Sequence, residues 1–231
     1  MEERLSPPWQ PWEAVPVVIA ALAAGLLAAV AIAALLGGVG GEALLLSTMA
    51  FHFSLAGFSI LWARLRHRSG VQALGLRSRR PIADALIGAL AGLGTVALVS
   101  FLVFPLEVLV WNALTGRPPG PIDQLPLDFT APVIVLGTIS VVVVSPVAEE
   151  IFFRGFLYGS LRGRFGFAAS AAISAATFSL FHPPPQLMVL IFVVGFVLAW
   201  LYERRGSLAG PIAAHVAFNL IGYVLIVMQR A

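Results

Sequence analysis

Two adjacent glutamates and an arginine, Glu149, Glu150 and Arg154, interrupt an apolar stretch of the chain. On a helix, Glu150 and Arg154 share a face because they are four residues apart, whereas Glu149 points about 100° away. We therefore expect Arg154 to neutralise Glu150 and to leave Glu149 unpaired. An unpaired carboxylate can act as the general base for a water molecule. The alternative is a structural ion-pair network between helices.

Two further pairs have the same four-residue spacing: Phe178 with His182, and His215 with Asn219. Each pair shares one face of a helix. Phe178 is expected to pack against the imidazole of His182 or to wall a substrate pocket, and His182, at a helix end, is either interfacial or catalytic. His215 and Asn219 can together hold a metal ion or a water, or donate hydrogen bonds to an oxyanion. Their alternative role is a polar clamp between helices.

Other polar residues in apolar stretches give weaker signals. His52 has no polar neighbour in sequence beyond Ser54 and is expected to bond a neighbouring helix. Glu107 is a lesser candidate for lining a cavity. Asp84 begins an apolar segment, where a carboxylate suits a helix N-terminus.

The three motifs, in their order along the chain, resemble the signature of the CPBP intramembrane proteases. This group includes the type II CAAX prenyl endopeptidases and the bacterial Abi proteins, with lysostaphin-resistance-protein-A-like members. The resemblance extends over residues 130–225, which we take as the catalytic core of a single membrane domain, 1–231. It implies a helical membrane fold with a cavity in the bilayer where peptide bonds are hydrolysed.

The resemblance also implies a role for each motif residue. Glu149 activates water with assistance from His182, His215 and Asn219 stabilise the oxyanion, and Glu150 and Arg154 form a supporting pair. Members of the group have been described both as metalloproteases and as metal-independent glutamate proteases, so no cofactor is assigned. Zn²⁺ is the candidate, and Glu149, His182, His215 and Asn219 are the side chains that could hold it.

Motifs of other intramembrane proteases are absent from the sequence. It contains no His-Glu-x-x-His, no Gly-x-Ser-Gly and no Gly-x-Gly-Asp. The favoured function is therefore an endopeptidase that cuts hydrophobic or prenylated (CAAX-like) peptides or proteins. The alternatives are a non-catalytic peptide-binding or bacteriocin-immunity protein, and a proton-coupled transporter, which the lack of internal repeats disfavours.

Composition places these residues in a membrane. The chain of 231 residues is 59% hydrophobic and 11% charged, without cysteine, and its mean hydropathy is +0.95. These values are typical of a polytopic membrane protein and exclude disulfides and thiol chemistry. All 14 basic residues are arginines, and their clustering in connections makes nucleic acid a poor partner.

Apolar runs predict an all-α fold with seven transmembrane helices, at 16–37, 43–63, 82–113, 131–161, 167–182, 186–202 and 208–228, or eight if Pro105 divides the third run. The first run is expected to be a retained helix rather than a signal peptide. Arginine-rich connections after the second, fourth and sixth runs are expected on one side, which gives a cytoplasmic N-terminus in a bacterial cell membrane.

The motif residues do not fall at one depth in this scheme. Counted from the arginine-rich ends, Glu149, His182 and His215 differ in depth by roughly 10 Å. Straight upright helices would keep them apart. Tilted helices, an uneven membrane surface or displaced helix boundaries must close the gap, and the prolines after His182 are a candidate place for irregular backbone that lines a cavity.

Overall fold

The computed structural model describes residues 7–117, 128–182 and 185–230, and these ranges contain helices and connections but no strands. The α-helices are α1 (Ala14–Leu36), α2 (Gly41–His67), α3 (Pro81–Leu98), α4 (Phe104–Thr115), α5 (Ala131–Gly137), α6 (Ser145–Glu149), α7 (Gly159–Arg162), α8 (Phe167–Leu180), α9 (Met188–Arg205) and α10 (Ala209–Arg230). The expected all-α fold is confirmed for these ranges. Most of the Pro- and Gly-rich connection at 115–124 lies outside the described residues.

Short helical segments complete the chain path. Three π-helices, η4 (Val99–Val103), η5 (Thr138–Val144) and η6 (Glu150–Tyr158), join α3 to α4, α5 to α6 and α6 to α7. The 3-10 helices are η2 (Pro11–Glu13), η3 (Val71–Leu74) and η7 (Pro185–Leu187). Each of the seven predicted apolar runs is helical over most of its length.

Six helical runs in the described part of the chain are long and apolar enough to cross a membrane. The remaining apolar helix, α8, has 14 residues, fewer than the roughly 20 that a crossing needs. The helical membrane architecture therefore agrees with the prediction, whereas the expected number of seven or eight crossings is not confirmed. Length and composition support six.

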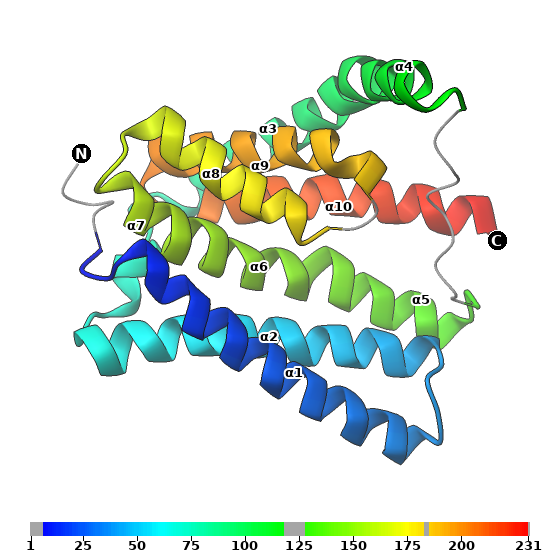
Figure 1. Ribbon diagram of the computed structural model, residues 1–231, viewed down its shortest axis with the longest axis horizontal. Coiled ribbons are helices and arrows are strands. Elements are labelled where there is room, and N and C mark those ends of the chain that lie inside the picture. The colour runs from blue at the N-terminus through cyan, green and yellow to red at the C-terminus, as the bar shows by residue number, and fades with distance from the viewer. Residues whose placement is uncertain (1–6, 118–127, 183–184, 231) are drawn as a thin grey trace.

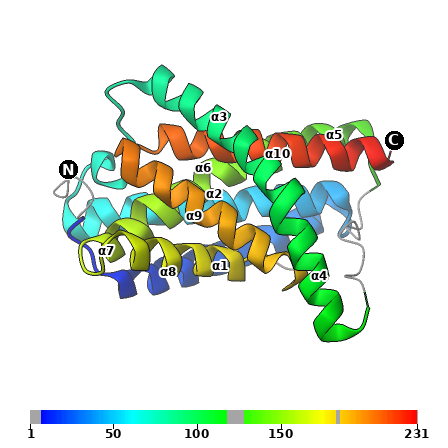
Figure 2. The same ribbon diagram turned by 90° about the horizontal axis from the view of Figure 1, so that it is seen from above.

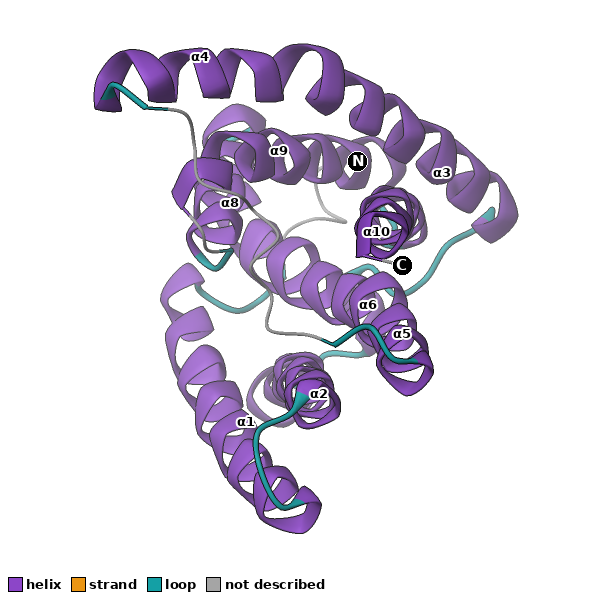
Figure 3. Cartoon of the chain, turned by 90° about the vertical axis from the view of Figure 1, so that its right-hand side faces the viewer, coloured by secondary structure: helices purple, strands orange, loops and turns teal. Residues whose placement is uncertain are grey.

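The segment α6–η6 lies at the centre of the bundle. It contacts α2, α8, α9 and α10, and the end-on view shows α6 between α2 on one side and α8 and α10 on the other (Figure 3). All nine residues of η6 are buried. The side chains of the first motif are thereby removed from both water and lipid.

Prolines explain two of the three π-helices. Both η4 and η5 end two residues before a proline, Pro105 and Pro146 respectively. A proline ring clashes with the carbonyl four residues earlier and offers no N–H, and a wider turn relieves both conflicts. The run expected to kink or divide at Pro105 is one continuous helical path, and α3 and α4 form a bent arc (Figure 3).

The arginine-rich connections lie at one end of the molecule. The end of α2, the beginning of α3, α7 and the end of α9 are all on the left in Figure 1, and the C-terminus is on the right. The same grouping is seen from above (Figure 2). The prediction that these connections share one side is confirmed.

Close packing of α3 on α10 yields a test of the fold. A Cβ added at Gly92 would lie 2.3 Å from the carbonyl oxygen of Ala214, next to His215, whereas one at Gly94 would meet nothing within 4 Å. We expect Gly92→Ala to lower the free energy of unfolding by about 1–3 kcal/mol, the usual cost of overpacking. Gly94→Ala, the matched control, should be neutral or stabilising. Thermal unfolding in detergent measures both, and equal stability of the two variants would contradict this packing.

Candidate active site

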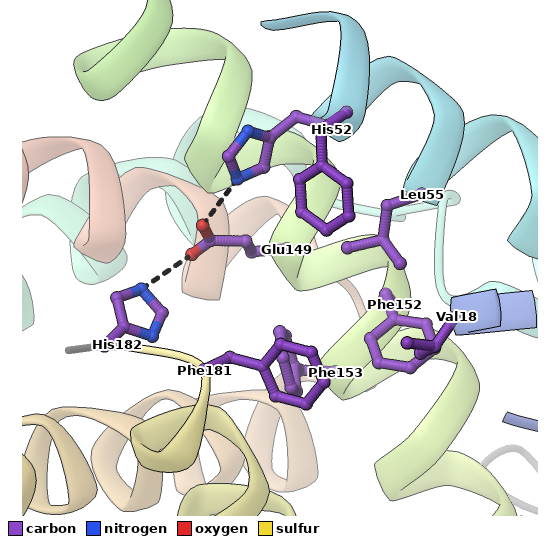
Figure 4. A pocket seen from close by; sticks show the side chains of 9 residues that line it. Val18, His52, Leu55, Glu149, Phe152, Phe153, Phe181 and His182 are labelled. Atoms are coloured by element: carbon purple, nitrogen blue, oxygen red, sulfur yellow. Dashed lines mark hydrogen bonds and ion pairs between the residues drawn. The ribbon is translucent and has the colours of Figure 1, made fainter. Parts of the chain in front are cut away.

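The carboxylate of Glu149 lies where four helical segments meet. Its Oε1 is 2.9 Å from Nε2 of His52 on α2. Its Oε2 faces Nε2 of His182 at 3.8 Å and Nε2 of His215 at 3.7 Å. His182 follows the end of α8 and His215 belongs to α10. Figure 4 shows Glu149 between His52 and His182.

The expectation that Glu149 is unpaired is wrong, because His52 binds it. His52 does bond a neighbouring helix, as predicted, but its partner is the candidate base itself. The sequence holds one signal that His52 faces protein, although it does not identify Glu149 as the partner. His52 and Ser59 are seven residues apart and both lie on the buried face of α2, so His52 faces protein rather than lipid.

The hydrogen-bond partners of His52 fix its protons. Nδ1 is 2.8 Å from the carbonyl oxygen of Thr48 and 3.3 Å from Oγ of Ser145. A hydroxyl can accept or donate, but a carbonyl only accepts, so the shorter contact requires a hydrogen on Nδ1. The bond from Nε2 to Glu149 needs a second proton, which belongs either to an imidazolium or to the carboxyl group. The pair therefore shares this proton and has no net charge. Neutrality lowers the cost of burying both groups.

Glu150 lies in a separate network, behind Glu149. Its Oε1 accepts hydrogen bonds from Arg154 Nη1 at 2.8 Å and His215 Nδ1 at 2.9 Å. Arg154 Nη2 donates to the carbonyl oxygen of Gly195 at 3.0 Å. Glu150 and Arg154 are both fully buried. The predicted ion pair between them is present, and it also holds the ring of His215.

Phe178 packs against this network. Its ring lies 4.4 Å from the ring of His182 and 5.7 Å from that of His215, and the guanidinium of Arg154 is 4.6 Å from its centre. The backbone carbonyl of Phe178 accepts a hydrogen bond from Nδ1 of His182 at 2.7 Å. Phe178 thus orients both motif histidines. Of its two expected roles, Phe178 has the first, packing against the imidazole of His182, and it is not among the side chains that line the cavity beside Glu149.

A cavity of about 200 Å³ lies beside Glu149, which forms part of its wall. Besides Glu149, His52 and His182, it is lined by apolar side chains from α1, α2, η6 and the end of α8: Val18, Phe51, Leu55, Phe152, Phe153 and Phe181 (Figure 4). Phe181 is 45% exposed, so the wall reaches the molecular surface. The arrangement suits an apolar group beside a polar reacting centre.

Asn219 is held near the same site by the backbone. Its Nδ2 donates a hydrogen bond to the carbonyl oxygen of Val141, at 2.9 Å, in the π-helix η5. A carboxamide has two N–H donors, so one remains for another acceptor. The predicted pairing of Asn219 with His215 on one face of α10 therefore persists, although the two side chains have different partners.

The gap in depth between the motif residues is closed. His182 lies beyond the last residue of the short α8, and the π-helical turns of η6 change the path of the chain next to Glu149. Irregular backbone therefore helps to bring the motif residues to the same depth. The prolines after His182, at 183–184, lie outside the described residues.

The four side chains that could hold Zn²⁺ do not form a recognisable metal site in the described residues. Over residues 7–117, 128–182 and 185–230, no three His, Asp or Glu side chains are placed to hold a metal ion. The hydrogen bonds from Nδ1 of His215 and Nδ2 of Asn219 leave Nε2 and Oδ1 as the atoms that could bind a metal. The described residues therefore assign no metal centre.

Glu107, the lesser candidate for the cavity, has another function. Its Oε1 accepts a hydrogen bond from the backbone N–H of Val189, at the beginning of α9. It satisfies a helix-terminal donor and does not line the cavity.

The fold and the site together define a polytopic helical membrane protein with a buried glutamate–histidine centre. Residues 131–221 match the family model of "Type II CAAX prenyl endopeptidase Rce1-like" proteins. The resemblance carried by the three motifs is thereby confirmed over these residues, which make up less than half of the chain. All motif residues lie inside the match, whereas His52 lies outside it.

Two curated proteins are similar to part of the chain. One is "Putative membrane peptidase YdiL" of Bacillus subtilis, 32% identical over 87 residues, which are 38% of this chain and 34% of that protein. The other is "UPF0177 protein YxdF" of Lactococcus lactis, 26% identical over 81 residues, 35% of this chain and 44% of that protein. The matches thus span less than half the length of either relative. No solved structure matches significantly.

The buried ion pair can be tested by stability. Arg154→Met leaves Glu150 charged and without its cation, so we expect the free energy of unfolding to fall by about 3–5 kcal/mol. The double variant Glu150→Gln/Arg154→Met should recover part of this loss. Arg66→Met is the control, because Arg66 is exposed and its substitution should change the free energy of unfolding by no more than about 0.5 kcal/mol. Similar losses for both arginines in denaturant titrations would refute the role of Arg154.

Proposed function

We propose that the chain is an intramembrane endopeptidase that hydrolyses peptide bonds with a water molecule activated by Glu149. One observation carries the proposal: Oε2 of Glu149 faces two imidazole nitrogens at 3.7 and 3.8 Å. These separations are longer than hydrogen bonds, and a water placed beside the three atoms would be within reach of each of them. The family match and the peptidase name of the Bacillus subtilis relative support the same class of reaction.

In this mechanism Glu149 acts as general base. His52 holds Oε1, so that Oε2 points at the water. As the water oxygen attacks the carbonyl carbon of the substrate, Oε2 takes one of its protons. When the C–N bond breaks, the same proton passes to the leaving amine, and the carboxylate is restored.

The histidines have different roles because their Nδ1 partners differ. His215 donates from Nδ1 to the carboxylate of Glu150, which can balance the charge of an imidazolium, and its Nε2–H then donates to the oxyanion. Asn219 supplies its second N–H to the same oxygen. His182 donates from Nδ1 to a carbonyl, so in the neutral ring Nε2 accepts a hydrogen from the water and orients it.

The substrate is proposed to be a hydrophobic or lipidated peptide or protein. The cavity beside Glu149 is apolar and aromatic apart from its titratable groups, so it would take an apolar side chain or lipid group next to the scissile bond. The family description names prenylated CAAX substrates, and an unprenylated apolar leader peptide satisfies the same chemistry. The protein would lie in a bacterial cell membrane with the arginine-rich end, and hence the N-terminus, in the cytoplasm.

Substitution of Glu149 tests catalysis. Glu149→Gln keeps the shape of the side chain but removes the base, so we expect cleavage to fall by about 10²–10⁴-fold, as for other general bases. Glu107→Gln is the matched control: it changes another buried intramembrane glutamate that does not line the cavity. Cleavage of prenylated and unprenylated apolar peptides in nanodiscs is followed by mass spectrometry.

The outcomes separate an enzyme from a binding protein. Cleavage that is lost in Glu149→Gln and retained in Glu107→Gln supports the proposal. Peptide binding without cleavage in the wild-type protein, or full activity of Glu149→Gln, would overturn it and favour a non-catalytic peptide-binding or immunity role.

The contact with His52 makes a separate prediction. His52→Ala frees Oε1 of Glu149 and removes the shared proton, so kcat should fall about 10–100-fold, as when other supporting hydrogen bonds to catalytic groups are lost. KM should change little. Ser54→Ala is the control, because Ser54 bonds only the carbonyl of Ala50 on its own helix. Steady-state kinetics that show an unchanged kcat for His52→Ala would remove His52 from the mechanism.

A further inference from the structure

A second cavity, of about 530 Å³, lies at the arginine-rich end of the molecule. It is bounded by the connection from η3 to α3 and by the turn between α9 and α10. Four arginines and one aspartate line it, with small or uncharged neighbours: Gln72, Ala73, Arg77, Ser78, Arg79, Arg80, Asp84, Arg205, Gly206 and Ser207. The volume is within the range of about 300–1,000 Å³ found for ligand sites.

The single carboxylate of this cavity is already satisfied. Asp84 is buried, and Oδ1 accepts a hydrogen bond from Arg205 Nε at 2.7 Å while Oδ2 accepts one from Ser78 at 2.6 Å. Arg205 therefore neutralises Asp84. Within the described residues, Arg77, Arg79 and Arg80 form no ion pair, and their positive charge is uncompensated.

The walls of the cavity are fixed by contacts between segments distant in sequence. The backbone N–H of Leu208 donates to the carbonyl oxygen of Gly75 at 2.9 Å, which ties the turn before α10 to the residue after η3. The bond between Arg205 and Asp84 ties the end of α9 to the first turn of α3. The segments that carry the arginines are thus held in place by hydrogen bonds to other parts of the fold.

The cavity also adjoins apolar surface. Ile82 and Leu86, one turn apart at the beginning of α3, are 76% and 62% exposed. A helix that is apolar enough to span a membrane begins there, so the cavity lies at the boundary between water and lipid. A ligand with an anionic head and an apolar tail matches both surfaces.

We propose that this cavity binds the phosphate-bearing headgroup of an anionic phospholipid from the membrane leaflet at the arginine-rich end. The planar guanidinium forks of Arg77, Arg79 and Arg80 match phosphate oxygens. The acyl chains lie along Ile82 and Leu86. Since α3 packs on α10, which carries His215, the bound lipid braces the helix pair behind the candidate active site.

Native mass spectrometry of the full-length protein tests the proposal with phosphatidylglycerol, phosphatidylcholine and free sn-glycerol 3-phosphate as probes. The variant Arg77→Gln/Arg79→Gln/Arg80→Gln removes the three uncompensated charges. The control Arg64→Gln/Arg66→Gln/Arg164→Gln removes equal charge from exposed positions at the same end, outside the cavity. Each arginine near an anionic surface contributes about fivefold in affinity, so three amount to about a hundredfold.

We expect phosphatidylglycerol to bind more tightly than phosphatidylcholine, the cavity variant to lose about a hundredfold in affinity, and the control to stay within a few-fold. Equal loss in both variants would mean diffuse attraction and overturn the proposal. So would equal binding of the two lipids, or displacement of the lipid by equimolar sn-glycerol 3-phosphate. Should the triple variant not fold, the single variant Arg79→Gln, with its fivefold loss, decides the question.

Discussion

A carboxylate inside a lipid-embedded bundle needs a proton or a cation beside it, and Glu149 obtains this from His52. Ionisable groups in hydrocarbon are costly unless they are paired and enclosed by protein. The requirement ties α2 to the central segment α6–η6 and keeps the carboxylate away from lipid. Because His52 engages one oxygen, the other is left facing His182 and His215 at 3.8 and 3.7 Å, where a water beside the three groups can contact each of them. The candidate chemistry therefore follows from how the charge is buried.

The charge of the second buried glutamate, Glu150, is compensated by different partners. The carboxylate of Glu150 accepts hydrogen bonds from Arg154, one helical turn further along, and from His215 of α10. The ring of Phe178 packs against both Arg154 and His215. Two adjacent carboxylates thus acquire distinct surroundings, one beside a cavity and one fully enclosed. Wide π-helical turns run through this region and place its side chains at angles that a regular α-helix would not give.

Most of the fold could be predicted from hydropathy, since all seven apolar runs are helical and the arginine-rich connections share one end. The motif residues could be predicted because ionisable side chains are rare in apolar stretches of sequence. The pairing of Glu150 with Arg154 could be predicted from their four-residue spacing on a helix. His52 was not assigned to the site because its contact with Glu149 joins residues 97 positions apart, which no local pattern records. The cavity walls and the packing role of Phe178 likewise depend on how helices pack, and the short α8 shows that an apolar run does not fix the number of crossings.

The central claim is that Glu149 and His52 share one proton, with the neighbouring histidines turned toward the same carboxylate. The chain has four histidines, few enough for ¹⁵N nuclear magnetic resonance of the imidazole rings in lipid nanodiscs. The account predicts that Nδ1 of His52 is protonated, that its Nε2 is hydrogen-bonded to a carboxylate, and that Glu149→Gln shifts this Nε2 signal while leaving that of His67, which bonds Glu13, unchanged. A His52 signal that is identical in the wild-type protein and in Glu149→Gln would contradict the account.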